Sequence, residues 1–308
     1  MDASAPLLIL GAGRSGTNLL AGAFAAETPR FRNLSENRYV WMYRQRDRRT
    51  EHRSAADATA AVAAYIRHHF ASRRANGEVA VDKTPGNAFR IPFIAAVYPD
   101  VRIVHIIRDG RDNILSRTRQ WQAQEPDEAH DAQPIRHLAG KLRLTRSRMR
   151  HAGRLRSAGA LPPALWPSLL RDASVPFLHH VATGRPRHYG ERIPGLAAIL
   201  RSQGLDVAAA VQWRETVMAG VVDGRRLGPA RYLEVRFERF LEAPVATWRG
   251  IAGFVGFTPS DAGERFLATS IRPAAARQRL SAPDQSRMDA LEPHLRPALE
   301  FLGYFWHR

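Results

Sequence analysis

Cysteine is absent from this chain of 308 residues, which excludes disulfide bonds, a thiolate nucleophile and a cysteine-ligated metal site. Long apolar runs are absent too. No stretch of about 18 consecutive apolar residues occurs, and the N-terminus lacks the basic and apolar regions of a signal peptide. We therefore expect no membrane span and a cytoplasmic protein. The apolar content of 44% is enough for a substantial core, and we expect a single large domain.

Acidic residues are scarce relative to basic ones, and lysine is almost missing among the basic ones. The chain has 29 acidic residues and 46 lysines and arginines, which gives a net charge of +17. Only Lys83 and Lys141 are lysines. Such a charge suits nucleic-acid binding. The arginines are scattered and form no long basic tract, so we expect no nucleic-acid partner, although a non-catalytic binder of anions or nucleic acid stays an alternative. The 12 histidines show no metal-ligand spacing, and we expect no metal.

An apolar run at residues 7–10 leads into a glycine-rich loop and then into a predicted helix. The backbone of such a loop can approach a ligand closely, and the unpaired N–H groups at the start of the helix attract anions. Arginine, serine and threonine side chains in the loop add further donors. The sequence therefore predicts a phosphate site, formed by Gly13, Arg14, Ser15, Gly16, Thr17 and Asn18.

Three other interpretations of this loop fit less well. The Walker A loop of nucleotide kinases and NTPases needs a lysine before its Ser/Thr, whereas Thr17 follows Gly16 directly. The glycine spacing also fits a dinucleotide-binding loop, and Glu36 lies near the distance expected for its acid. However, residues 28–35 do not resemble the buried parallel strand that this fold requires. The third alternative is a plain glycine turn without a ligand.

A second strand, turn and helix are predicted at residues 101–117. Residues 101–107 form an apolar run typical of a buried strand. Arg108 follows where that strand ends, and Ser116 lies about two turns into the next helix, so both can flank one anion beside the first loop. This pairing suggests a second phosphate. His105, in the middle of the strand, is interpreted as a core histidine.

Predicted strands alternate with predicted helices along most of the chain, which indicates an α/β fold with a parallel sheet. Further strands are expected at 78–82 and 231–237, and helices at 58–70, 87–97, 206–218, 243–255 and 284–301. Residues 54–57 form a capping-box-like start for the first of these helices, and Asn76-Gly77 a stop signal after it.

Residues 120–204 differ in composition, because prolines interrupt a segment dense in arginine and histidine. We interpret this segment as an inserted helical cap that binds the acceptor, with a solvated helical lobe as the alternative, and residues 1–119 and 205–308 as the nucleotide-binding core. Within it, residues 138–156 can form a basic amphipathic helix. The aromatic residues that offer a surface to an acceptor are Trp121, Trp166, Phe177 and Tyr189.

The chain resembles the sulfotransferases that use 3′-phosphoadenosine-5′-phosphosulfate (PAPS), and most closely the bacterial group whose cores are similar to tyrosylprotein sulfotransferases. The motifs that carry this resemblance are Gly-Arg-Ser-Gly-Thr at 13–17, Lys-Thr-Pro at 83–85, Arg108 with Ser116, and Val-Arg-Phe-Glu at 235–238. The likeness covers roughly residues 6–119 and 205–280. It implies a P-loop-like three-layer core with a central parallel sheet, plus a helical cap insertion.

The resemblance also implies roles for individual residues. The first loop holds the 5′-phosphosulfate, Arg108 and Ser116 hold the 3′-phosphate, and Glu36 is the catalytic base. Arg272 falls where similar enzymes bring a late basic residue over the nucleotide, and Arg277 and Arg279 compete for that role.

Lys83 stands out because arginine is the usual cation of this chain, so a compact point charge is indicated there. Its ammonium can neutralise charge on the leaving group, and Arg14 can stabilise the equatorial oxygens during in-line transfer. The alternatives are ordinary ion pairs: Lys83 with Asp82 or Asp109, Glu36 with Arg38, and Arg108 with Asp112.

The sequence thus predicts a PAPS-dependent sulfotransferase that acts on a hydroxyl or amine of a small-molecule or peptide acceptor. A nucleotide kinase or NTPase is the competing enzyme class. The sequence specifies neither the acceptor nor the oligomeric state.

Overall fold

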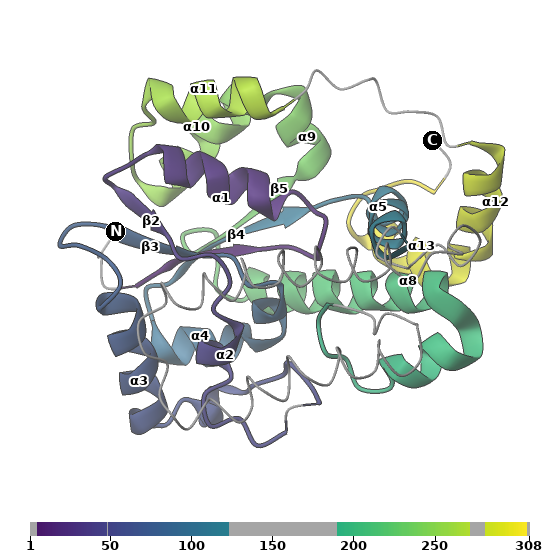
Figure 1. Cartoon of the computed structure of the whole chain (residues 1–308), viewed down its shortest axis with the longest axis horizontal. Coiled ribbons are helices and arrows are strands. Elements are labelled where there is room, and N and C mark those ends of the chain that lie inside the picture. The colour runs from purple at the N-terminus through teal and green to yellow at the C-terminus, as the bar shows by residue number, and fades with distance from the viewer. Residues whose placement is uncertain (1–4, 48, 123–189, 272–280, 307–308) are drawn as a thin grey trace, which may run out of the picture. The chain divides into compact units, whose positions relative to one another are not determined.

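A five-stranded parallel sheet lies at the centre of the computed structural model, which describes residues 5–47, 49–122, 190–271 and 281–306. The strands are β1 (Leu7–Leu10), β2 (Phe31–Asn33), β3 (Val79–Asp82), β4 (Arg102–Ile107) and β5 (Tyr232–Arg236), in the order β2-β3-β1-β4-β5 (Figure 1). Leu8 of β1 is in register with Asp82 on one side and Ile103 on the other. The predicted α/β class and parallel sheet are confirmed.

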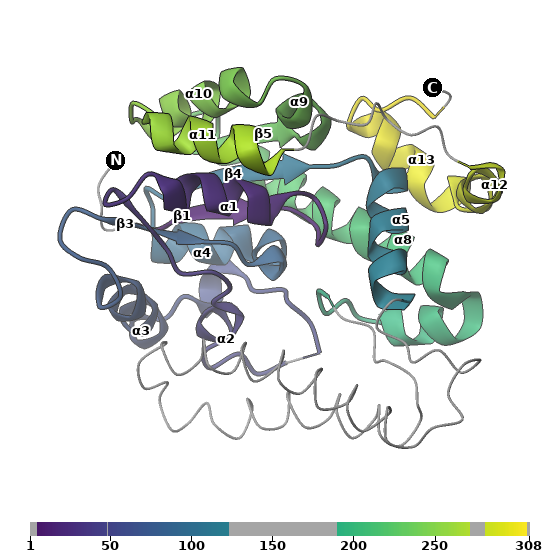
Figure 2. The ribbon, with the colours of Figure 1, turned by 45° about the horizontal axis from the view of Figure 1, so that its top comes forward.

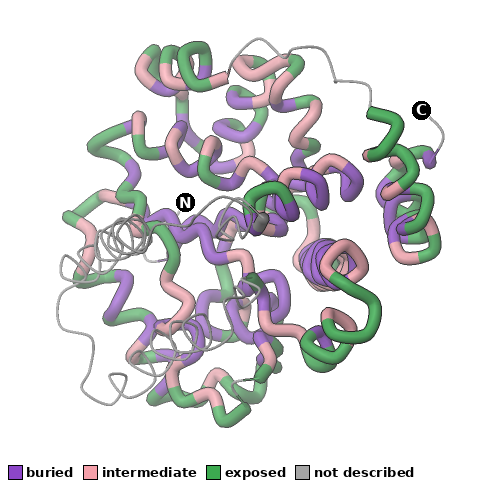
Figure 3. Tube along the Cα trace, turned by 45° about the vertical axis from the view of Figure 1, so that its right-hand side comes forward, coloured by how far each residue is buried: buried purple, intermediate pink, exposed green. Residues whose placement is uncertain are grey.

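The sheet is buried on both faces, and this explains the continuous apolar runs of its central strands. Successive residues of β1 alternate between two cores: Leu7 and Ile9 belong to one, Leu8 and Leu10 to the other. All four are fully buried. Figure 3 shows that buried and exposed stretches alternate along the turns of the helices.

Helices cover each face of the sheet (Figure 2). Those on the first face are α1 (Thr17–Ala26), α9 (Phe237–Glu242), α10 (Pro244–Val255) and α11 (Asp261–Ser270). Those on the second are α2 (Arg38–Trp41), α3 (Ala60–Ala71), α4 (Ile91–Val97) and α8 (Leu196–Arg225). Helix α5 (Gly110–Gln122) follows β4, and α12 (Ala282–Ala290) and α13 (Glu292–Phe301) follow near the C-terminus. The expected three layers are therefore present.

Several predicted boundaries were wrong for local reasons. The capping box at Ser54 starts a short 3-10 helix, η1 (Ala55–Asp57), and α3 begins anew with its own cap at Thr59 and ends before the predicted stop signal. The helix predicted at 87–97 is a 3-10 helix, η2 (Pro85–Arg90), followed by α4, whose first turn contains Pro92. A proline there fits, because the first turn has N–H groups without partners.

Other elements differ more strongly from the predictions. Residues 31–33 form strand β2, although residues 28–35 did not resemble a parallel strand, and α11 was not predicted at all. Helix α8 begins within the range expected for the cap, and it changes direction at Gly204, whose φ of 86° is not helical. The helix predicted at 284–301 is two helices, α12 and α13.

The contacts divide the chain into two compact units, residues 1–118 with 190–308, and residues 119–189. The amphipathic helix predicted at 138–156 and the aromatic residues Trp166, Phe177 and Tyr189 lie outside the described residues. No helix in the described ranges is both long and apolar enough to cross a lipid bilayer.

Candidate nucleotide-binding and catalytic site

The first loop connects β1 to α1 and presents backbone groups at the start of a helix. Gly16 is the N-cap of α1 with φ 90°, and as a glycine it has no side chain to cap the first turn. A Cβ on Gly16 would lie 2.4 Å from the ring of Phe237, so glycine is required both for its conformation and for this close contact. The N–H groups of the first turn of α1 lie at the end of the helix where the sequence predicts an anion site.

The side chains of this loop differ in how they can act. Arg14 and Asn18 are exposed, while Ser15 and Thr17 are buried. Arg14 has φ 72°, an unusual conformation for a residue other than glycine. The buried Ser15 hydroxyl accepts a hydrogen bond from Asn113 Nδ2 at 3.1 Å. Arg14 is thus the loop side chain most available to a ligand, and Ser15 contributes to the packing of the loop.

The second segment contacts the first loop directly. Arg108, at the end of β4, donates from Nη1 to the carbonyl oxygen of Arg14 at 3.0 Å, and Arg14 donates from Nε to Ser116 Oγ at 3.2 Å. The Arg108 guanidinium also lies 5.0 Å from the ring centre of Phe237. Burial lowers the pKa of Arg108 from its ordinary value. Residues about 100 positions apart in sequence, 14 with 108 and 116, are thereby brought together at one edge of the sheet.

Sequence reasoning missed a buried brace behind this loop, formed by Asn113, Arg117, Glu191 and Gln212. The Gly13 carbonyl oxygen accepts from Asn113 Nδ2 at 2.9 Å and from Arg117 Nη2 at 3.0 Å, and the Gly13 N–H donates to Glu191 Oε1 at 3.4 Å. Arg117 forms an ion pair with Glu191 at 3.6 Å and donates to the Gln212 side chain. Both backbone polar groups of Gly13 are held, so the brace fixes the orientation of the loop.

The Arg117–Glu191 pair is buried, and its removal is expected to destabilise the fold. Arg117→Ala should lower the free energy of unfolding by about 3–5 kcal/mol, because it leaves the Glu191 carboxylate buried without its cation. Urea denaturation would measure this loss. Replacement of both residues by leucine should cost less than Arg117→Ala alone, and a double variant as unstable as the sum of the single ones would contradict the pairing.

Glu36 and Lys83 form an ion pair at the same end of the sheet, just beyond the carboxyl ends of strands β2 and β3. Lys83 Nζ lies 2.7 Å from Glu36 Oε1, with side-chain exposures of 10% and 53% respectively. The backbone joins them as well, since the Lys83 N–H donates to the Ser35 carbonyl oxygen at 3.0 Å. Of the alternative partners, Arg38 pairs with Glu51 and Asp109 with Arg111 at 2.8 Å, while Asp112 attracts Arg108 electrostatically. The carboxylate that the resemblance assigns as base therefore contacts the predicted catalytic lysine.

The position of β2 also bears on the dinucleotide interpretation. In a dinucleotide fold, the strand carrying the acid lies beside the first strand. Here β3 lies between β1 and β2, so the end of β2 is two strand spacings, roughly 9–10 Å, from the first loop. Glu36 is thus placed differently from a ribose-binding acid.

A second polar cluster missed by the sequence analysis lies beneath the Glu36–Lys83 pair. Its centre is Asp82, which is completely buried. Burial raises the pKa of Asp82 to about 6, although side-chain hydrogen bonds from Asn37, Trp41 and Thr84 oppose this rise. The only sequence signal for this cluster was the position of Asp82 next to the chosen lysine.

The remaining predicted residues have varied outcomes. His105 is fully buried, its Nδ1 lies 2.6 Å from the Tyr232 hydroxyl, and burial lowers its pKa to about 3, as befits a neutral core histidine. Its Nε2 has no hydrogen-bond partner. Arg272, Arg277 and Arg279 lie outside the described residues.

Asp109 is engaged in a way that differs from a magnesium-binding acid after a β-strand. Its carboxylate accepts from the N–H and Nε of Arg111 at 2.9 and 3.0 Å. The Asp109 N–H donates to Glu238, which also accepts from the Tyr304 hydroxyl at 2.9 Å. These contacts anchor the start of α5 and therefore the segment that carries Arg108. Among the described residues, no group of three or more histidine or acidic side chains is placed to hold a metal ion.

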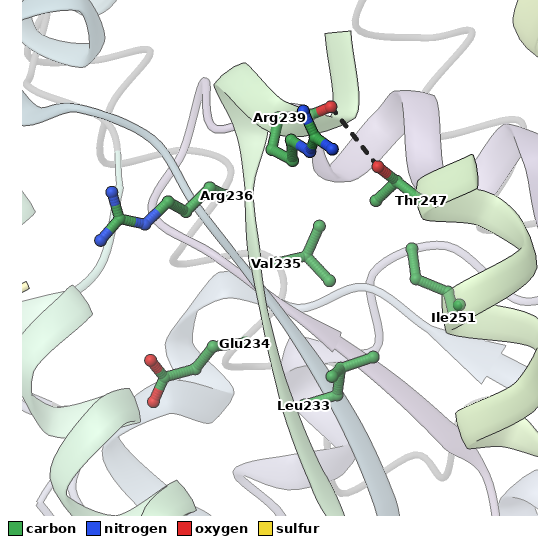
Figure 4. Close-up of a pocket in the computed structure, with 8 residues that line it drawn as sticks. Leu233, Glu234, Val235, Arg236, Arg239, Thr247 and Ile251 are labelled. Carbon is green, nitrogen blue, oxygen red and sulfur yellow. Dashed lines mark hydrogen bonds between the residues drawn. The ribbon is translucent and has the colours of Figure 1, made fainter. Parts of the chain in front are cut away.

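A hollow of about 380 Å³ lies elsewhere, along the outer edge of β5 (Figure 4). It is lined by residues 233–236 of β5 and by Arg239, Thr247 and Ile251, and Thr247 Oγ1 donates to the Arg239 carbonyl oxygen at 3.4 Å. None of its lining residues belongs to either phosphate segment, so this hollow is not the predicted nucleotide site.

Comparison with solved structures places the fold among bacterial sulfotransferases. A sulfotransferase from Mycobacterium avium is 12% identical, with 98% of this chain and 77% of that chain covered and a TM-score of 0.50. The sulfotransferase domain of the olefin synthase from Synechococcus PCC 7002 is 15% identical, with coverages of 99% and 97% and a TM-score of 0.48. A sulfotransferase from Alicyclobacillus acidocaldarius is 12% identical, with coverages of 97% and 96% and a TM-score of 0.46.

Sequence comparison is more decisive than these distant structures. No curated protein matches the chain. The sequence profile of the sulfotransferase family matches residues 6–164, about half of the chain. That range includes both predicted phosphate segments and the Glu36–Lys83 pair. The chain therefore belongs to the sulfotransferase family.

Proposed function

We propose that this sulfotransferase takes its sulfuryl group from PAPS and transfers it to a hydroxyl or amine of an acceptor. The observation that supports this donor best is the contact between the two predicted phosphate segments, through Arg108, Arg14 and Ser116. A nucleotide with phosphates at the 5′ and 3′ positions of its ribose offers the first to the loop before α1 and the second to Arg108. A nucleotide without a 3′-phosphate offers Arg108 no ligand anion beyond the carboxylates of Asp112, Glu238 and Asp109, which already act on it.

Transfer is proposed to proceed by in-line displacement at sulfur. An oxygen or nitrogen of the acceptor forms a new bond to sulfur while the bond from sulfur to the bridging phosphate oxygen breaks. The acceptor proton passes to the Glu36 carboxylate, and 3′-phosphoadenosine-5′-phosphate leaves with the bonding electrons. Because charge spreads over the equatorial oxygens, positioned cations contribute most of the rate enhancement. Arg14, the exposed cation of the loop, is suited to that role.

The Glu36–Lys83 pair suits both halves of this displacement. The Glu36 side chain is half exposed, so an acceptor can reach it, whereas Lys83 is mostly buried. An ammonium group has three N–H donors, so Lys83 can hold Glu36 and still donate to the leaving oxygen. We propose Glu36 as the general base and Lys83 as the group that neutralises the leaving phosphate.

Thermal unfolding in the presence of nucleotides tests the proposed donor. The product 3′-phosphoadenosine-5′-phosphate should stabilise the protein by roughly 2.7 kcal/mol at about 100 times its dissociation constant. Adenosine 5′-phosphate, ATP with Mg²⁺ and NAD should stabilise it less at the same concentration. If ATP with Mg²⁺ or NAD is the selective ligand instead, the loop binds a different nucleotide and the proposed donor is wrong.

A further inference from the structure

The buried Asp82 carboxylate holds the segment that carries Glu36. Asp82 Oδ1 accepts from the Asn37 N–H at 3.2 Å, from Asn37 Nδ2 at 2.8 Å and from Thr84 Oγ1 at 3.1 Å. Asp82 Oδ2 accepts from Trp41 Nε1 at 3.0 Å and from Asn87 Nδ2 at 2.8 Å. All five donors are neutral. They stabilise the ionised carboxylate by hydrogen bonds.

Hydrogen bonds hold the backbone N–H and both side-chain polar atoms of Asn37. Besides its contacts with Asp82, its N–H lies 2.9 Å from Thr84 Oγ1, its Nδ2 donates to the Leu34 carbonyl oxygen, and its Oδ1 accepts from His69 Nε2 at 3.0 Å. Since Oδ1 can only accept, His69 carries its proton on Nε2. Glu36 directly precedes this fixed residue, and Lys83 directly follows Asp82.

We infer that Asp82 is a positioning residue of the sulfuryl-transfer site: by binding Asn37, it sets the geometry of the Glu36–Lys83 pair. This inference rests on the proposed roles of Glu36 and Lys83. The two chain segments continue side by side from the parallel strands β2 and β3, with Asn37 in contact with Asp82 and Glu36 in contact with Lys83. A shift of Asn37 therefore moves Glu36 relative to Lys83.

Protonation of Asp82 would weaken this arrangement. Burial raises its pKa to about 6, and protonation would place an O–H on an oxygen that now accepts hydrogen bonds, so at least one of the five bonds would be lost. The ionisable groups around it are Glu36 and Lys83 beside it, His69 of α3, Arg90 of η2 and Tyr98 after α4. Burial lowers the pKa of His69 to about 3, so His69 does not titrate in the same range.

The small number of lysines allows a direct measurement. Only Lys83 and Lys141 occur, so ¹³C-labelled lysine gives two side-chain Cε signals, which the Lys141→Arg variant assigns. In the wild type, the Lys83 signal should show an inflection near pH 6. The inflection should persist in Glu36→Gln, because it arises from Asp82.

Two variants of the buried cluster distinguish positioning from general stability. Asp82→Asn should abolish the inflection and lower kcat about 10- to 100-fold, with unchanged binding of 3′-phosphoadenosine-5′-phosphate, because misplacement of a reacting group by about 1 Å is enough for such a loss. The Asn87 amide can rotate by 180° in this variant, so that its Oδ1 faces the new amide nitrogen at position 82 and accepts from it. Asn87 Oδ1 is available for this because it has no hydrogen-bond partner. Trp41→Phe removes one donor on the side away from Asn37. Well above the pH of the inflection, the kcat of Trp41→Phe should equal that of the wild type. The inflection itself should move to higher pH, because the ionised Asp82 carboxylate has lost one donor.

Turnover in this comparison is release of 3′-phosphoadenosine-5′-phosphate from PAPS with p-nitrophenol as the probe acceptor. Asn37→Ala is the second test if Asp82→Asn does not fold, and it should lower kcat in the same direction. A wild-type inflection in Asp82→Asn, or a wild-type kcat in both Asp82→Asn and Asn37→Ala, would overturn the inference. Failure of the nucleotide to bind would instead refute the proposed donor, and the lysine titration would still decide the role of Asp82.

Discussion

Replacement of Glu36 by glutamine is expected to lower the turnover number about 100- to 10,000-fold, the contribution typical of a general base. Glutamine keeps the size and the oxygen that accepts from Lys83 Nζ, at 2.7 Å in the wild type. It cannot take the acceptor proton. The dissociation constant of 3′-phosphoadenosine-5′-phosphate should stay the same, because the first loop and Arg108 remain intact.

Measurement of kcat and nucleotide binding side by side separates this effect from misfolding. Glu300→Gln is the matched control, since Glu300 forms an exposed ion pair with Arg296 on α13 and should have little effect on either quantity. Lys83→Ala should also lower kcat far more than binding, by about 100- to 1,000-fold if it stabilises the leaving group. Wild-type turnover in Glu36→Gln would remove Glu36 as the base.

These two residues show on what grounds the sequence can nominate candidates for the site. Lys83 was chosen because lysine is rare in this chain, and Glu36 because of the family resemblance. Their mutual contact was not predicted, because it depends on β2 lying beside β3. Strand β2 was missed, since only Phe31 of its three residues is buried. An edge strand with one buried side chain lacks the apolar pattern by which strands are recognised.

The central strands were predictable for the opposite reason. Strands β1 and β4 are buried on both faces, so each is mostly apolar and ends at one of the two loops that the sequence analysis assigns to phosphates. The brace behind the first loop was not predictable in full. Asn113 and Arg117 share a helix face with Ser116 and could have been found by their spacing. Glu191 lies 178 residues from Gly13, and no local pattern connects the two.

The network around Asp82 illustrates a further limit. In the sequence, Asp82 is simply an acidic residue before a lysine, and nothing there indicates a buried carboxylate with five neutral hydrogen-bond donors. Its donors come from residues 37, 41, 84 and 87, which meet only when β2, α2 and η2 pack around the end of β3. Long-range polar contacts of this kind are determined by the fold, while the propensities that sequence analysis uses are local.

Arg108→Ala is expected to weaken binding of 3′-phosphoadenosine-5′-phosphate about 10- to 100-fold, since a hydrogen bond to a charged group contributes about 1.5–3 kcal/mol. Binding of adenosine 5′-phosphate should change much less, because that nucleotide has no anion for Arg108. Some loss is expected for both, since Arg108 also donates to the Arg14 carbonyl oxygen at 3.0 Å and so supports the first loop. The ratio of the two losses is therefore the quantity to measure, by titration calorimetry.

Arg108→Lys sharpens this test, because lysine keeps the charge but loses the planar pair of donors that matches a phosphate. It should recover part of the affinity for the 3′-phosphorylated nucleotide. Arg249→Ala is the matched control, since Arg249 pairs with Glu264 on the exposed surface of α10 and α11. Equal losses for both nucleotides in Arg108→Ala would show that Arg108 acts only as a support for the loop, and the second phosphate site would then have to lie elsewhere.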